Sequence, residues 1–184
     1  MRKRMEKRLV YLYSGELTSV IMFIFMSYAL NRGYPNLQLY SLTSFWASFL
    51  LLEILLLQGS VYWYSKLKRL RIEHTSVTPT RVVQQFKSLR KLNLGLIIAP
   101  IMMFIIDFIK WYPALPLAGL IFVGCIYIFA ILEYINYFHV QLSYDNSSDL
   151  KYLLKTKKLK QACISRDFER ISKVEKLNNV KLTE

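Results

Sequence analysis

Two glutamates stand in long apolar runs with no lysine or arginine nearby. Glu53 lies within FWASFLLLEILLLQG (residues 45–59), and Glu133 lies within AILEYINYF (residues 130–138). Apolar surroundings disfavour a charged carboxylate, so each acid is expected to be protonated unless it has a partner. Two kinds of chemistry follow: hydrogen bonds that hold helices together, or a site that takes up a proton or a cation.

Each glutamate has a polar neighbour at helical spacing. Ser60 follows Glu53 by two turns, and Asn136 follows Glu133 by three residues. The candidate proton or cation site therefore consists of Glu53, Glu133, Asn136 and Ser60. The same side chains would also serve as packing contacts without any transport role, and the sequence leaves both interpretations open.

The remaining two carboxylates in apolar runs have simpler explanations. Glu16 lies two turns after Arg8, so it can pair with a basic group at the membrane surface. Asp107 precedes Lys110 by three residues, a spacing that favours an ion pair on one helix face. We expect structural roles for both acids.

These acids sit in four apolar blocks, residues 9–30, 42–64, 94–112 and 115–138. A helix of about 20 apolar residues crosses a hydrocarbon core about 30 Å thick. The sequence thus predicts an all-α integral membrane protein with four transmembrane helices. The three parts are a basic N-terminus (1–8), a transmembrane domain (9–142) with a connecting loop (65–93), and a basic tail (143–184).

Lysine and arginine alternate between the two sides of this arrangement. Five precede the first block, eight lie in loop 65–93 and ten lie in the tail, whereas each of the other two connections carries one. Basic segments stay in the cytoplasm, so both termini are predicted to be cytoplasmic in a multi-pass plasma membrane protein. The abundance of Lys, Ile, Tyr and Asn favours a bacterial membrane.

Loop 65–93 contains a second pattern. Thr78 and Pro79 are typical of a helix start, with the threonine hydroxyl as the cap. Apolar residues then recur at helical spacing, which predicts a short amphipathic helix on anionic headgroups or a connector packed on the tail. Its basic residues, the candidate lipid contacts, are Arg81, Lys87, Arg90 and Lys91.

The tail is predicted to form two helices joined by the basic stretch KTKKLK. Leu150, Leu153 and Leu154 mark the apolar side of the first. The basic stretch can attract anionic lipid or an acidic partner, or merely orient the chain. Its lysines are Lys155, Lys157, Lys158 and Lys160. Nucleic acid is not expected as a partner, because the basic residues lie where membrane topology requires them.

Short motifs recur 78 to 81 residues apart. The motif Phe-x-x-Leu-Glu ends at Glu53 and again at Glu133, and Met22 and Met103 begin similar tetrapeptides. The recurrence fits two duplicated helical hairpins, with the two glutamates at a shared interface, although apolar segments also match by chance.

Motifs for catalysis, metals and cofactors are missing from the sequence. The two histidines are far apart, and the two cysteines do not form a metal-binding pattern. We expect no enzyme activity, cofactor or metal site. The leading hypothesis is an accessory, regulatory or protective subunit that binds another membrane protein or itself. The alternative is a proton- or cation-linked transporter or channel that uses the intramembrane acids.

Overall fold

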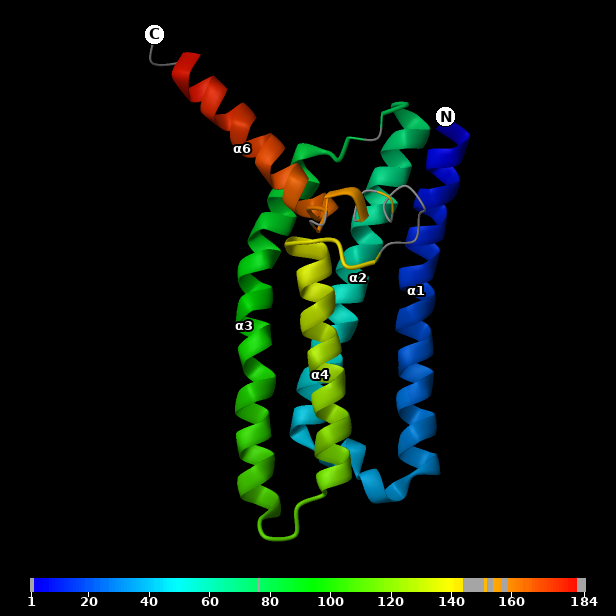
Figure 1. Cartoon of the computed structure of the whole chain (residues 1–184), viewed down its shortest axis with the longest axis vertical. Coiled ribbons are helices and arrows are strands. Elements are labelled where there is room, and N and C mark those ends of the chain that lie inside the picture. Colours follow the sequence, from blue (N-terminus) through cyan, green and yellow to red (C-terminus); the bar gives the residue numbers. More distant parts are fainter. Residues whose placement is uncertain (1, 76, 144–150, 152–153, 157–158, 182–184) are drawn as a thin grey trace.

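Four long helices form the body of the protein (Figure 1). The computed structural model describes residues 2–75, 77–143, 151, 154–156 and 159–181, with side chains described as far as Lys173. The helices are α1 (Arg2–Gly33), α2 (Thr43–Ile72), α3 (Thr80–Trp111), α4 (Leu117–Phe138) and α6 (Cys163–Lys181), with short 3₁₀ turns η1 (Pro35–Leu37) and η2 (Leu39–Ser41). Within this described part no strand forms; Val140 and Gln161 make an isolated bridge.

Helices α1 to α4 are each long and apolar enough to cross a membrane, so the prediction of four helices of that kind is confirmed. Helix α2 is the centre of the bundle: 67% of its most apolar stretch is buried, against 11%, 17% and 22% for α1, α3 and α4. The other three helices pack around α2 and turn large apolar side chains outward. Those outward faces are suited to lipid.

Both described ends of the chain lie at one end of the bundle, together with the α2–α3 connection (Figure 1). We call this the basic end, because residues 2–8, 65–75 and 77–93 and helix α6 carry most of the positive charge. Here Glu6 of α1 accepts a hydrogen bond from Arg71 of α2 at 2.7 Å. The opposite end holds only the short connections η1–η2 and 112–116.

The predicted amphipathic loop helix is not a separate element. Residues 80–93 are helical, but they form the first turns of α3, which runs without a break to Trp111. Val83 and Phe86 are buried, so this segment packs on the protein rather than lying flat on headgroups. The predicted cap is also wrong: Pro79 takes the cap position, and the Thr78 hydroxyl instead donates to Asp167.

The predicted ion pair between Asp107 and Lys110 is also wrong. The Asp107 carboxylate does not pair with Lys110; it is fully buried and accepts hydrogen bonds from the start of α2. Thr43 donates its amide (3.0 Å) and hydroxyl (2.8 Å), and Ser44 donates its amide (2.7 Å). A negative group at a helix N-terminus satisfies otherwise unpaired amides and complements the helix dipole. Asp107 thereby fastens the last turn of α3 to the first turn of α2.

Two further polar contacts join the helices inside the bundle. Gln58 of α2 and Asn93 of α3 exchange a pair of amide hydrogen bonds at 2.9 and 2.8 Å, both buried. Tyr127 of α4 donates to the Ile97 carbonyl of α3 at 2.8 Å, in the turn where Pro100 disturbs the backbone ladder. In an apolar medium such paired groups fix which helix faces meet.

Helix α6 is attached to the basic end through Asp167. This carboxylate accepts from Tyr62 of α2 (2.8 Å) and from Thr78, and it pairs with Arg170 at 3.2 Å. Beyond this anchor α6 points away from the bundle (Figure 1). The predicted first tail helix falls mostly outside the described residues, as do Leu150, Leu153, Lys157 and Lys158.

Candidate functional site

A pocket of about 350 Å³ lies between α1 and α4 in the half of the bundle toward the basic end. Its lining includes Leu56 and Trp63 of α2 and Cys163 and Ile164 of α6. Gly15 and Ser19 of α1 also line it, and nothing lies within 4 Å of a Cβ placed on Gly15. These small residues leave open space between the helices.

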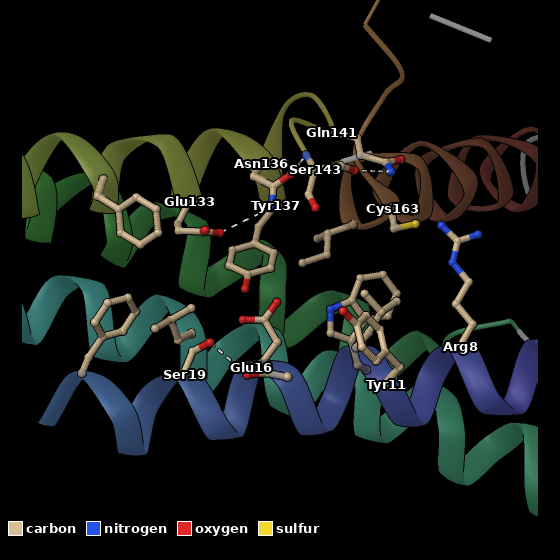
Figure 2. A pocket seen from close by; sticks show the side chains of 17 residues that line it. Arg8, Tyr11, Glu16, Ser19, Glu133, Asn136, Tyr137, Gln141, Ser143 and Cys163 are labelled. Carbon is tan, nitrogen blue, oxygen red and sulfur yellow. Dashed lines mark hydrogen bonds between the residues drawn. The ribbon is translucent and has the colours of Figure 1, made fainter. Parts of the chain in front are cut away.

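Two glutamates face this pocket from opposite walls (Figure 2). Glu16 comes from α1 and Glu133 from α4, and the Tyr137 ring projects between them. Because both carboxylates line one small pocket, they would repel each other when both are charged. A proton or a cation between them would remove that repulsion.

Two polar groups lie beside Glu16. Tyr137 is only 5% exposed, and its hydroxyl and the Trp63 indole N–H both interact with the Glu16 carboxylate, but neither makes a well-formed hydrogen bond within the described part of the chain. Both residues line the pocket. Buried polar groups without a well-formed hydrogen bond are uncommon, and their presence in a pocket indicates a place for a ligand or an ordered water.

Gly59 of α2 explains how Tyr137 reaches this position. A Cβ at residue 59 would lie 2.5 Å from the Tyr137 hydroxyl oxygen, which is closer than atoms approach. Only a glycine lets the tyrosine ring lie across α2 at this depth. The sequence EYINYF thus places Glu133 and Tyr137, one turn apart, on the pocket side of α4.

Asn136 lies in the pocket but also performs a structural task. Its Nδ2 approaches Glu133 at 3.4 Å, while its Oδ1 accepts from the Leu142 amide at 2.8 Å. The side chain therefore orients Glu133 and holds the backbone that follows α4. Arg8 and Tyr11 lie at the far end of the pocket from Ser19, and Arg8 has other interactions there (Figure 2).

The four residues of the predicted site do not lie together in the structure. Glu133 and Asn136 are brought together in the pocket, whereas Glu53 and Ser60 do not line it. Glu53 is 7% exposed, and neither its carboxylate nor the Ser60 hydroxyl has a hydrogen-bond partner among the described residues. Helical register places both on the side of α2 that carries Leu67, which packs with Leu9 of α1.

A second pocket of about 240 Å³ adjoins the first in the half toward the short connections. Its lining is almost entirely apolar and includes Phe45, Phe49 and Phe122. Phe23 and Phe129 line both pockets and form an edge-to-face pair with ring centroids 5.9 Å apart. This aromatic pair therefore lies at the boundary between the polar first pocket and the apolar second pocket.

The predicted lipid contacts lie at the basic end. Arg81, Lys87 and Lys91 are exposed on α3, and Arg90 is half-buried. Partial burial, together with the charge of Arg90, lowers the pKa of His139, so this imidazole favours its neutral form. In the tail Lys155 is exposed and Lys160 is half-buried, while Lys157 and Lys158 lie outside the described residues.

Sequence reasoning missed Glu16 and Tyr137 as site residues. The available signals were the small residues Gly15 and Ser19 around Glu16, and the one-turn spacing from Glu133 to Tyr137. Among the described residues no group of three or more His, Cys, Asp or Glu is placed to hold a metal ion. Comparison with models of known families, with curated proteins and with solved structures gives no significant match. Function must therefore be inferred from the pocket itself.

Proposed function

We propose that this chain is a proton- or cation-linked membrane transporter whose binding site is the pocket between Glu16 and Glu133. The observation that carries the proposal is the pair of carboxylates that face one pocket beside the buried hydroxyl of Tyr137, which makes no well-formed hydrogen bond among the described residues. Acids inside membrane helices are costly to keep and commonly mark ion or proton paths. A site with two acids takes cationic cargo in preference to anionic cargo.

The direction of the site follows from the charge distribution. We propose a bacterial plasma membrane with both termini in the cytoplasm, because the basic end then satisfies the positive-inside rule. The pocket would open toward the cytoplasm. At the opposite end, a buried cluster that includes Leu42 and Val123 packs the start of α2 against α4, and the second pocket in this half is apolar, which supports a cytoplasm-facing state for the polar pocket.

The repeated motifs belong to the same proposal. Two duplicated hairpins would make α2 equivalent to α4 and Glu53 equivalent to Glu133. Glu53 is buried and has no hydrogen-bond partner among the described residues, so it would then be a second proton-binding site outside the first pocket.

Flux measurements in proteoliposomes test this function. Wild type and the variants Glu16→Gln and Glu133→Gln are compared for proton and monovalent-cation flux, with Glu73→Gln, an exposed acid outside the pocket, as the control. We expect flux in wild type and the control, and a loss of at least tenfold in both pocket variants at equal incorporation. Equal flux in all four proteins, or none in any, would refute transport through this pocket.

A second candidate function is an accessory, regulatory or protective subunit that binds a membrane partner. It is favoured by helix α6, which is anchored through Asp167 and then points away from the bundle (Figure 1). Near the anchor the apolar side of α6 packs on the bundle, where Ile164 and Ile171 are buried. In the sequence that apolar side continues at Val174 and Leu177, and such a continuation is the kind of surface that a partner helix covers. Purification in mild detergent from the native membrane would then recover a stoichiometric partner, and repeated recovery of the chain alone would contradict it.

A further inference from the structure

The polar and apolar pockets form two parts of one path along α1 and α4. Phe23 and Phe129 belong to both linings, so the two spaces meet at this aromatic pair. Phe129 is 40% exposed, and its ring can therefore change rotamer without disturbing the core. A single elongated molecule can occupy both spaces when that ring turns.

The two parts differ sharply in chemistry. The first presents Glu16, Glu133 and the aromatic residues Tyr11, Trp63 and Tyr137. Carboxylates attract a positive charge, and aromatic faces bind ammonium groups through cation–π contacts. In the second, Ser27 is already bonded to the Ile24 carbonyl at 2.8 Å, so nothing polar there requires a ligand partner except the weakly polar thiol of Cys125.

We infer that the joined pockets bind an amphipathic organic cation. Its ammonium group lies in the first pocket beside the Tyr137 ring, within reach of Glu16 and Glu133, and its apolar tail passes Phe129 into the second pocket. This inference rests on the proposed function, and it names the class of cargo that the site takes.

Other occupants fit less well. An inorganic cation leaves the apolar pocket without a role. A phospholipid phosphate would be attracted to Arg8 at the far end of the pocket but repelled by Glu16 and Glu133, and it would leave those two carboxylates without a positive partner. An amine or quaternary ammonium with a hydrocarbon tail satisfies the charge of the first pocket and the apolar lining of the second.

A series of trimethylammonium ions with increasing alkyl chains tests this assignment. Tetramethylammonium, hexyltrimethylammonium and decyltrimethylammonium are bound to the full chain in nanodiscs of zwitterionic lipid, by equilibrium dialysis, after subtraction of uptake by empty nanodiscs. Cys125→Phe, and the milder Cys125→Leu, fill the apolar pocket. Ile121→Phe is the matched control, because Ile121 is exposed on the same helix and lines neither pocket.

In wild type and Ile121→Phe we expect affinity to rise about fourfold for each of the first added methylenes. Cys125→Phe should remove this dependence on chain length while leaving tetramethylammonium binding unchanged. Glu133→Gln should weaken every member of the series at least tenfold.

Three results would overturn the inference. Equal, Glu133-dependent affinity across the series would show that the alkyl chain makes no contact with the apolar pocket and that only the ammonium group is recognised, and the proposed function would survive. Chain-length dependence that persists in both Cys125 variants would place the tail in the bilayer. Absence of Glu133-dependent binding for every member would remove both the inference and the proposed site.

Discussion

Asp107 is a buried carboxylate whose three hydrogen bonds all come from the start of α2. Asp107→Ala leaves the amides of Thr43 and Ser44 and the Thr43 hydroxyl without an acceptor, so we expect the free energy of unfolding to fall by about 2 to 3 kcal/mol. Reversible unfolding in mixed detergent micelles measures the change. Lys110→Ala is the control, and its effect should stay within about 0.5 kcal/mol. Equal losses of unfolding free energy in both variants would instead support the predicted ion pair between Asp107 and Lys110.

Gly59 provides a second residue-level prediction. Gly59→Ala places a methyl group against the Tyr137 ring, so we expect a loss of about 1 to 3 kcal/mol in unfolding free energy and weaker tetramethylammonium binding as Tyr137 is displaced. At Gly124 nothing lies within 4 Å of the added carbon. Gly124→Ala should therefore leave cation binding intact and stabilise α4 slightly. Unchanged cation affinity in Gly59→Ala would argue against a role for the Tyr137 hydroxyl.

At the level of elements, the Gln58–Asn93 amide pair joins α2 to α3. Gln58→Leu or Asn93→Leu alone leaves one amide buried without its partner, and each should cost about 1 to 3 kcal/mol of unfolding free energy. The double variant replaces both amides with apolar groups and should lie much closer to wild type. A double-mutant cycle measures the coupling. Strictly additive losses would mean that the pair does not act as a unit.

The helices also show why some features could be predicted from the sequence and others could not. The four long apolar helices were predictable, because the hydropathy of a segment depends only on the residues within that segment. The partner of Asp107 lies 63 to 64 residues away, so a helical spacing rule found Lys110 instead. The amphipathic pattern of residues 80–93 was real, but nothing in it breaks the helix before Pro100, and the segment therefore continues into α3.

The candidate site was only half predictable for a related reason. Glu133 and Asn136 are neighbours on one helix, so their spacing reveals them. Glu16 joins them only because α1 and α4 both pack on α2 and leave a pocket between their facing sides. In the sequence Glu53 and Glu133 look alike, because each is an acid in an apolar run. In the structure Glu133 lines the pocket, whereas Glu53 is buried outside it.

The whole molecule has two kinds of surface: an apolar surface along the sides of the bundle and a basic surface at one end. The outward faces of α1, α3 and α4 are apolar along the bundle. The basic residues gather at the end where both described ends of the chain lie (Figure 1). A protein with this distribution is expected to insert in one orientation, because moving many lysines and arginines across the bilayer is unfavourable. The proposed direction of the acidic pocket depends on that orientation.

Labelling of single cysteines tests the orientation directly. In a variant with Cys125→Ser and Cys163→Ser, Asn36→Cys puts an exposed thiol in the short connection after α1, and Thr80→Cys puts one at the start of α3. In intact bacterial cells a membrane-impermeant maleimide should label Asn36→Cys and spare Thr80→Cys, and permeabilised cells should label both. The reverse pattern would turn the basic end outward, so that the pocket between Glu16 and Glu133 would collect its cation from outside the cell.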